Sequence, residues 1–318
     1  MAHVSEHHRH SHSAVSYRLA LAGALTLGFV GFEAAAGWHA NSLALLTDAA
    51  HNLTDALALG LSWYAHRLAS RPAHAGKTFG YHRAGILAAL VNSSSLALIS
   101  FGIFHEAWGR FNAPPQVASD VLMSVGAAAF VVNLVTAWLV SHGSEDDLNL
   151  RSAFLHLLGD VFSTLVAMAA GVGIWLTGQY WLDPAASVFI GILILWNAWS
   201  ILRETGDILL ESTPADIDMS LMVRDFLQVP EVRGVHDLHV WSLSRNLRML
   251  SAHIVIDDVP LSQAAVLRRQ LRAVMHERYG IDHLTLQLEC DGCDPDDLYC
   301  DIASHSHRSE RLAGGSQA

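Results

Sequence analysis

Between residues 17 and 204 the sequence contains six long apolar stretches that are separated by short polar connections. Each stretch reaches the roughly 20 residues that a helix needs to cross the hydrocarbon layer of a bilayer. The 318-residue chain is 52% hydrophobic and only 15% charged, which is too apolar for one soluble domain of ordinary composition. The pattern predicts an α-helical membrane protein with six transmembrane helices, over residues 17–39, 43–69, 84–108, 119–141, 152–178 and 182–204.

The connections between these stretches differ in charge. The connection between the second and third stretches, with the helix ends that flank it, is basic and contains Arg67, Arg71, Lys77 and Arg83. The first-to-second and fifth-to-sixth connections contain no Lys or Arg. By the positive-inside rule, the N-terminus, the 70–83 and 142–151 loops and the C-terminus are expected in the cytoplasm. The N-terminus lacks the apolar core of a secretory signal, so we expect no cleaved segment.

After about residue 210 the pattern becomes that of a soluble domain. An amphipathic helix over 216–228 is followed by two alternating strand patterns, a second helix and a third strand. The order αββαβ predicts a small, ferredoxin-like two-layer α+β domain in which both helices pack on one face of the sheet. The later elements are expected over residues 235–244, 247–257, 261–279 and 283–289.

We therefore expect four parts along the chain. A His-rich cytoplasmic arm (1–16) precedes the transmembrane domain (17–210), and a cytoplasmic metal-regulatory and dimerisation domain (211–290) precedes a flexible tail with Cys and Asp (291–318). The arm either captures metal or is a solvated tail; its histidines are His3, His7, His8, His10 and His12. The net charge of −11 and the single lysine argue against a nucleic-acid partner.

Two of the apolar stretches carry a His and an Asp four residues apart, His51 with Asp55 and His156 with Asp160. On a helix this spacing puts both side chains on one face. Ionisable groups at membrane depth cost about 2.5 to 3.5 kcal/mol each on insertion scales, so four of them need a compensating partner. Two imidazoles and two carboxylates are the ligand number and type of a tetrahedral divalent-metal site. The pattern predicts a zinc-transport site.

Other polar residues in the apolar stretches are weaker candidates. Asp48 lies on the same helical face as His51, about one turn away. It is either a carboxylate behind the site or on the exit path, or a water-facing polar residue. For Glu33, Asn92 and Asn133, interhelical hydrogen bonding is the preferred interpretation.

Five segments resemble those of the cation diffusion facilitators, which export zinc and related divalent metals in exchange for protons. They read SLALLTDAAHNLTD, TFGYHRAGILAA, HGSEDDLNLRSAFLHLLGD, LLESTP and GVHDLHVWSL. The resemblance implies that His51, Asp55, His156 and Asp160 bind the transported ion, and that the protein is a homodimer. It is greatest to bacterial zinc exporters, which implies an integral protein of the bacterial inner membrane. Cadmium, cobalt and nickel also suit nitrogen and oxygen ligands.

Two candidate metal sites lie beyond the membrane segments. His236 and His239 are three residues apart on an expected strand, so opposite faces are predicted. The resemblance implies that His236, His253 and the strand ending at Glu289 line a regulatory site, although Gln287 stands where some relatives have a His. Ordinary polar strand residues are the alternative. In the tail, the thiols either bind metal or are reduced and exposed; they are Cys290, Cys293 and Cys300.

The resemblance also implies a charge pair between Arg83 and Glu211, which fixes the membrane domain to the soluble one. Asp207 competes for the same arginine, and two solvated rim charges of little energetic consequence are the alternative.

Metal ligation requires deprotonated imidazoles, so protons and zinc compete for the same groups. This competition predicts proton-coupled antiport. An intramembrane zinc hydrolase would need an open coordination position and a general base, and the sequence has no H-E-x-x-H or G-x-S-x-G motif. We therefore expect no enzyme and no organic cofactor, with zinc as substrate and as a regulatory ion. A membrane-anchored metal sensor is a further alternative, which metal flux would separate from a transporter.

Overall fold

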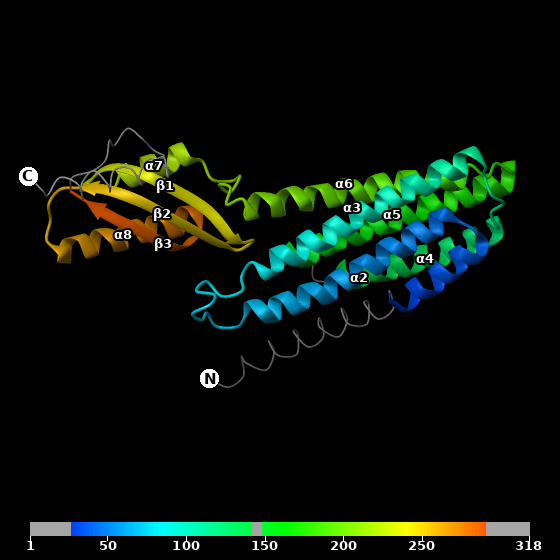
Figure 1. Ribbon diagram of the computed structural model, residues 1–318, viewed down its shortest axis with the longest axis horizontal. Coiled ribbons are helices and arrows are strands. Elements are labelled where there is room, and N and C mark those ends of the chain that lie inside the picture. Colours follow the sequence, from blue (N-terminus) through cyan, green and yellow to red (C-terminus); the bar gives the residue numbers. More distant parts are fainter. Residues whose placement is uncertain (1–26, 142–147, 291–318) are drawn as a thin grey trace, which may run out of the picture. The chain divides into compact units, whose positions relative to one another are not determined.

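The computed structural model describes residues 27–141 and 148–290, which form two compact units (Figure 1). The first unit holds the described residues up to Arg67 together with Leu87–Arg203. The second holds the Leu68–Ile86 segment and the described residues from Glu204 onward.

Long helices dominate the first unit. A helix over residues 27–40 precedes five labelled helices, which are α2 (Leu43–Ala69), α3 (Ala84–Asn112), α4 (Ser119–Ser141), α5 (Leu148–Thr177) and α6 (Leu182–Leu209). Among the described residues, four helices are long and apolar enough to cross a membrane: α3, α4, α5 and α6. Helix α2 is equally long, but Asp48, His51 and Asp55 lower its mean hydropathy. The first predicted span begins outside the described residues. The chain thus has a helical transmembrane domain.

The surface of these helices is apolar, which is the reverse of a soluble protein. Trp196 on α6 is 80% exposed, and Leu98 on α3 is 72% exposed. Exposed tryptophans also lie near helix ends, at Trp38, Trp108 and Trp175. Because the indole ring favours the boundary between lipid and water, this distribution fits helices surrounded by a bilayer.

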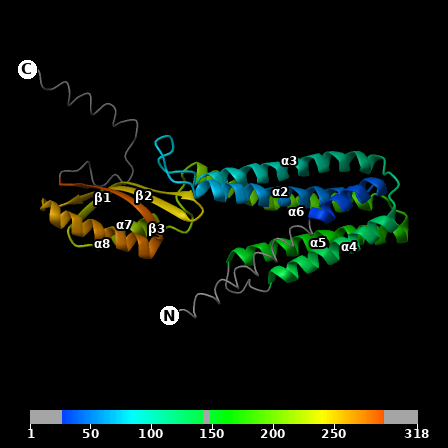
Figure 2. The same cartoon turned by 90° about the horizontal axis from the view of Figure 1, so that it is seen from below.

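Helices α4 and α5 pack directly against each other, and Figure 2 shows them side by side. Glycines make this close approach possible. A Cβ atom at Gly126 would lie 2.9 Å from Cγ of Met168, and one at Gly171 would lie 2.9 Å from Cγ of Met123. Small residues are the usual means of close helix packing in membranes, where no hydrophobic effect drives association.

The first residues of α2 are held by a residue of α6. Asp183 is fully buried, and its carboxylate accepts hydrogen bonds from the backbone N–H groups of Leu43 (2.7 Å) and Ala44 (3.2 Å). These N–H groups have no partner within their own helix, so Asp183 caps α2 from outside. The cap fixes this end of α2, which carries His51 and Asp55, to the start of α6.

The second unit contains the predicted αββαβ order. Its elements are α7 (Met219–Leu227), β1 (Val232–Ser244), β2 (Leu247–Ile256), α8 (Leu261–Tyr279) and β3 (Ile281–Glu289). Strand β2 is central, antiparallel to β1 and parallel to β3. Phe226 of α7 and Leu271 of α8 share one core with Ala252 and Ile254 of β2. Both helices therefore cover the same face of the sheet, as predicted.

The prediction that His236 and His239 point to opposite faces is wrong. Strand β1 contains a bulge, at which Asp237 has a φ of 49°. As a result, His236 pairs with His253 and His239 pairs with Ser251. Residues two apart on β2 lie on one face, so both histidines lie on that face too. The extra residue of the bulge offsets the odd spacing of the two histidines.

Candidate metal-transport site

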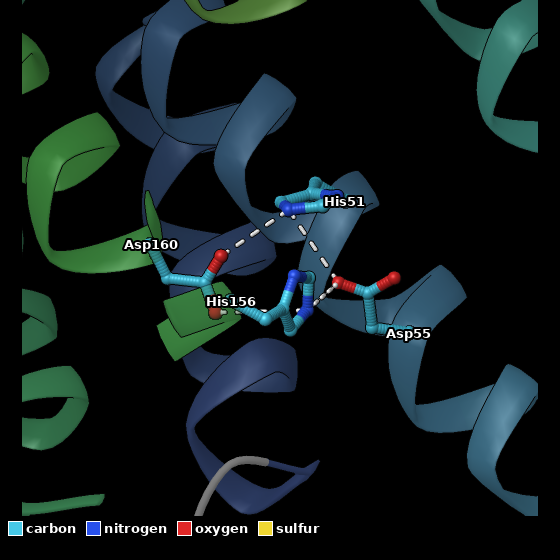
Figure 3. Close-up of side chains that lie close together, drawn as sticks. All are labelled: His51, Asp55, His156 and Asp160. Carbon is cyan, nitrogen blue, oxygen red and sulfur yellow. Dashed lines mark hydrogen bonds and ion pairs between the residues drawn. The ribbon is translucent and has the colours of Figure 1, made fainter. Parts of the chain in front are cut away.

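Figure 3 shows His51 and Asp55 of α2 facing His156 and Asp160 of α5. One ligand atom from each of the four residues can be chosen so that all four lie within 4.8 Å of one another. The two members of each pair are one helical turn apart, as their spacing predicts. Two helix faces thus supply two nitrogen and two oxygen ligands to one point.

The distances within this four-residue group suit a tetrahedral ion. His51 Nε2 lies 3.4 Å from Asp55 Oδ2 and 3.3 Å from Asp160 Oδ1. His156 Nε2 lies 3.0 Å from Asp55 Oδ2 and 4.0 Å from Asp160 Oδ2. Ligands that bind zinc tetrahedrally at 2.0–2.1 Å are about 3.3 Å apart. The donor set and its spacing therefore fit zinc with only small side-chain movements.

The group borders a cavity of about 850 Å³. On α2 the lining residues run from His51 to Ser62, and on α6 from Ile190 to Ile201. The cavity thus extends along α6 toward the C-terminal end of that helix. His51 and Asp160 are almost fully buried, whereas the His156 side chain is 38% exposed. An ion entering the cavity would meet His156 and Asp55 before the deeper pair.

Hydrogen bonds from neighbouring helices hold parts of the group in place. The Asn133 amide of α4 donates to the backbone carbonyl of Asp160 (3.4 Å), which confirms the predicted interhelical role of Asn133. Asn92 lines the cavity. Nδ1 of His51 is buried and has no hydrogen-bond partner among the described residues, so packing and the facing carboxylates orient this ring.

Asp48 lies outside the four-residue group. It is 1% exposed and accepts hydrogen bonds from the Ser163 hydroxyl (2.6 Å) and the Asn52 amide (3.4 Å). It is therefore not a water-facing residue. Glu33 is also buried, but neither of its carboxylate oxygens has a hydrogen-bond partner in the part of the chain that the structure describes. The polar groups nearest to Glu33 are Asp48 and Asn52 of the next helix, so its interhelical hydrogen bonding stays a prediction.

A second group lies in the C-terminal unit, on the face of the sheet opposite α7 and α8. His236, His253 and Glu289 offer ligand atoms within 4.8 Å of one another. The Glu289 carboxylate lies 3.1 Å from His236 Nε2 and 3.1 Å from His253 Nδ1. Asp237, which sequence reasoning missed, lies 3.6 Å from His253 Nε2. Gln287 donates to Glu289 (2.6 Å) and thus helps to orient this carboxylate.

The remaining predicted residues are only partly described. Arg83 and Glu211 form an ion pair of 2.6 Å, although both belong to the second compact unit. Their side chains are 35% and 58% exposed, so solvent screens the pair. Cys290 is exposed and free. Cys293, Cys300 and the His-rich arm lie outside the described residues.

A metal-ligand group between membrane helices, followed by a separate α+β domain, is typical of a metal-ion transporter. The chain belongs to the cation efflux family. Residues 19–210 match its model "Cation efflux transmembrane domain", and residues 214–291 match "Cation efflux protein, cytoplasmic domain". It is thus an integral membrane protein with a cytoplasmic C-terminal domain.

Several bacterial proteins are similar over most of the chain. A "Cadmium, cobalt and zinc/H(+)-K(+) antiporter" of Bacillus subtilis is 37% identical, over 89% of this chain and 91% of that protein. The "Zinc transporter ZitB" of Pectobacterium atrosepticum is 38% identical, over 96% and 94%. The protein of the same name from Escherichia coli is 34% identical, over 94% and 98%.

Proposed function

We propose that this protein exports zinc from the cytoplasm in exchange for protons, by alternating access at His51, Asp55, His156 and Asp160. One observation carries this proposal. Two imidazole nitrogens and two carboxylate oxygens converge between α2 and α5. They lie beside a cavity that extends toward the C-terminal end of α6, the end that leads into the cytoplasmic domain. No other set of described residues in the membrane helices offers such ligands.

The charges of the group support a divalent ion. Two neutral imidazoles and two carboxylates around a doubly charged cation make a neutral assembly, which a low-dielectric surrounding tolerates far better than unpaired charges. Nitrogen and oxygen ligands in a tetrahedron suit zinc, and cadmium, cobalt and nickel follow as further substrates. The names of the Bacillus and Pectobacterium relatives both include zinc, and the Bacillus name also includes cadmium and cobalt.

Proton coupling follows from the same ligands. An imidazole that binds a proton at Nε2 can no longer bind metal there, so protons displace zinc when the site faces a proton-rich compartment. The site then returns in its protonated form. Each cycle moves zinc outward and protons inward without a further energy source.

The membrane arrangement is part of this proposal. It has six spans within residues 17–210, both termini in the cytoplasm and the bacterial inner membrane as location. Residues 211–290 form the dimerisation domain of a homodimer, in which His236, His253 and Glu289 bind a regulatory zinc ion. The arm (1–16) and the tail (291–318) supply additional metal ligands, and the Arg83–Glu211 pair joins the end of α6 to the start of α3.

Zinc flux into proteoliposomes after a pH jump tests the transport site. Loss of one direct ligand in Asp55→Ala or Asp160→Ala should reduce flux by more than about tenfold, because loss of even an outer-shell partner typically costs 10–100-fold in metal affinity. Asp120→Ala is the matched control, since Asp120 is an exposed carboxylate at the start of α4. Full flux in both site variants, or flux that ignores the pH gradient, would contradict the proposal.

A further inference from the structure

Glu33 is a buried acid that is not one of the four ligands of the transport site. It lies on the helix over residues 27–40 and is 0% exposed. Neither carboxylate oxygen has a hydrogen-bond partner among the described residues. The polar side chains that face it are Asp48 and Asn52 of α2. A fully buried acid without a donor is rare, because an unpaired charge in a low-dielectric interior is very costly.

Asp48 is equally enclosed. Its only hydrogen-bond donors in the described structure are the Ser163 hydroxyl and the Asn52 amide. The charged groups that act on Asp48 besides Glu33 are His51 on its own helix and Asp160 on α5. No Lys or Arg of the described chain pairs with Glu33 or Asp48. Two ionised carboxylates would therefore face each other with no cation between them.

Two carboxyl groups in this arrangement keep one proton, because like charges in contact cannot both ionise in a low-dielectric surrounding. This proton removes the repulsion between the two carboxylates and supplies the missing hydrogen bond between them. As a carboxylic acid, Glu33 loses its unpaired charge and can donate an O–H hydrogen bond to Asp48. Asp48 then has three donors, which is what a buried carboxylate needs.

We propose that Glu33 and Asp48 form a proton-binding pair, separate from the four metal ligands. The pair lies away from the large cavity, since neither residue lines it, whereas Ser163 borders both. The Ser163 hydroxyl donates to Asp48 and also lies 2.9 Å from the backbone carbonyl of Asp160. Through this serine the pair contacts the α5 half of the transport site.

This inference rests on the proposed function for its role in transport. The pair binds one proton in addition to those that compete with zinc at the imidazoles, and it releases that proton from Glu33 to water when α2 and α5 rearrange. Replacing Glu33 with Gln should lower the number of protons exchanged per zinc ion by one. Zinc stoichiometry at the four ligands should remain unchanged, because Glu33 is not among them.

Infrared spectroscopy of the full-length, zinc-free protein in lipid tests the pair directly. At pH 7 the wild type should show the carbonyl band of a protonated carboxylic acid, which Glu33→Gln removes and Glu33→Asp retains. Glu106→Gln is the control, because Glu106 is exposed and paired with Arg110 (2.9 Å). A wild-type spectrum without this band, or a band that survives in Glu33→Gln, would overturn the proposal.

Two further measurements keep the result interpretable. If Glu33→Gln does not fold, Asp48→Asn should shift the Glu33 band, because an amide replaces the carboxylate that accepts its hydrogen bond; an unmoved band contradicts the pair. In proteoliposomes, an unchanged proton-to-zinc ratio in Glu33→Gln contradicts its role in coupling. If the wild type moved no protons, the proposed antiport would fail, whereas the infrared result would still decide whether the pair exists.

Discussion

The hydroxyl of Ser42 donates a hydrogen bond of 2.6 Å to the carboxylate of Asp183, which lies 141 residues later in the chain. The same carboxylate caps the first turn of α2, and the Arg110 guanidinium lies 3.9 Å from it while donating to the Asn41 carbonyl (2.7 Å). The starts of α2 and α6 are thereby joined to the last turn of α3. This junction determines how far along the bundle axis His51 lies.

Replacing Asp183 with Ala should destabilise the protein and reduce transport. The change leaves buried donors at the start of α2 unpaired, at a cost of about 1–3 kcal/mol for each group. We expect a lower thermal unfolding temperature in detergent and a lower zinc flux, while Asp183→Asn, which retains one acceptor oxygen, lies between. Ser42→Ala should have the smallest effect. Equal stability of Asp183→Ala and wild type would show that the cap is dispensable.

The close packing of α4 and α5 predicts a strong effect at Gly126. A leucine there would overlap Met168, and overpacking typically costs about 1–3 kcal/mol. Gly126→Leu should therefore lower the unfolding temperature, and Met168→Ala in the same chain should restore part of the loss by making space. Gly102→Leu is a suitable control, because a Cβ atom at Gly102 has no neighbour within 4 Å. Failure of the double variant to recover would mean that the contact is not the cause.

Acid should weaken the cytoplasmic domain through Asp225. Hydrogen bonds from the Tyr279 hydroxyl (2.7 Å) and the Arg278 guanidinium lower the pKa of this carboxyl, and desolvation and Asp225 raise the pKa of Tyr279 to about 12. A carboxyl with a lowered folded-state pKa stabilises the fold above its unfolded pKa of about 3.9, and this contribution disappears as the pH falls through the folded value.

Asp225→Asn should accordingly be less stable than wild type at pH 7, and the difference should shrink as the pH falls below 3.9. Hydrogen exchange of α7 and α8 in the full-length protein measures this difference. A gap that stayed constant down to the acid limit would show that the ionised carboxylate is not what stabilises the domain.

The His236, His253 and Glu289 group predicts one zinc ion per chain beyond the transported one. His253→Ala should remove this ion from the purified protein, because two remaining ligands hold zinc poorly. His276→Ala is the control, since His276 is exposed and lies outside the group. Metal analysis after exhaustive dialysis gives the stoichiometry, and an identical zinc content in both variants would argue against a regulatory site.

Much of the architecture follows from short-range patterns that a sequence displays. The apolar stretches predict α2 and α6 to within a few residues, since burial in lipid leaves little freedom in helix length. The His-x-x-x-Asp spacing predicts which side chains share a helix face. It cannot predict that the α2 and α5 faces meet, because that depends on packing between residues more than 100 positions apart.

The relations that the sequence does not display are long-range or depend on local irregularity. Asp183 precedes a proline, and this pattern predicts only the start of its own helix, α6. Its carboxylate instead caps α2. The bulge at Asp237 reverses the expected direction of His239, and a single Asp within an alternating strand pattern is too weak a signal to predict it. The surroundings of Glu33 depend on which groups α2 presents to it, and only the folded bundle determines them.

The equal division of the four ligands between α2 and α5 makes the bundle a two-armed chelator. Each helix alone offers two ligands, and the high affinity of the complete four-ligand site depends on the effective concentration of one ligand pair near the other. A modest separation of the two helices therefore lowers affinity for both arms together, without rotation of any ligand side chain. Because Gly126 and Gly171 allow α5 to pack closely against α4, the ligand pair on α5 moves together with both helices.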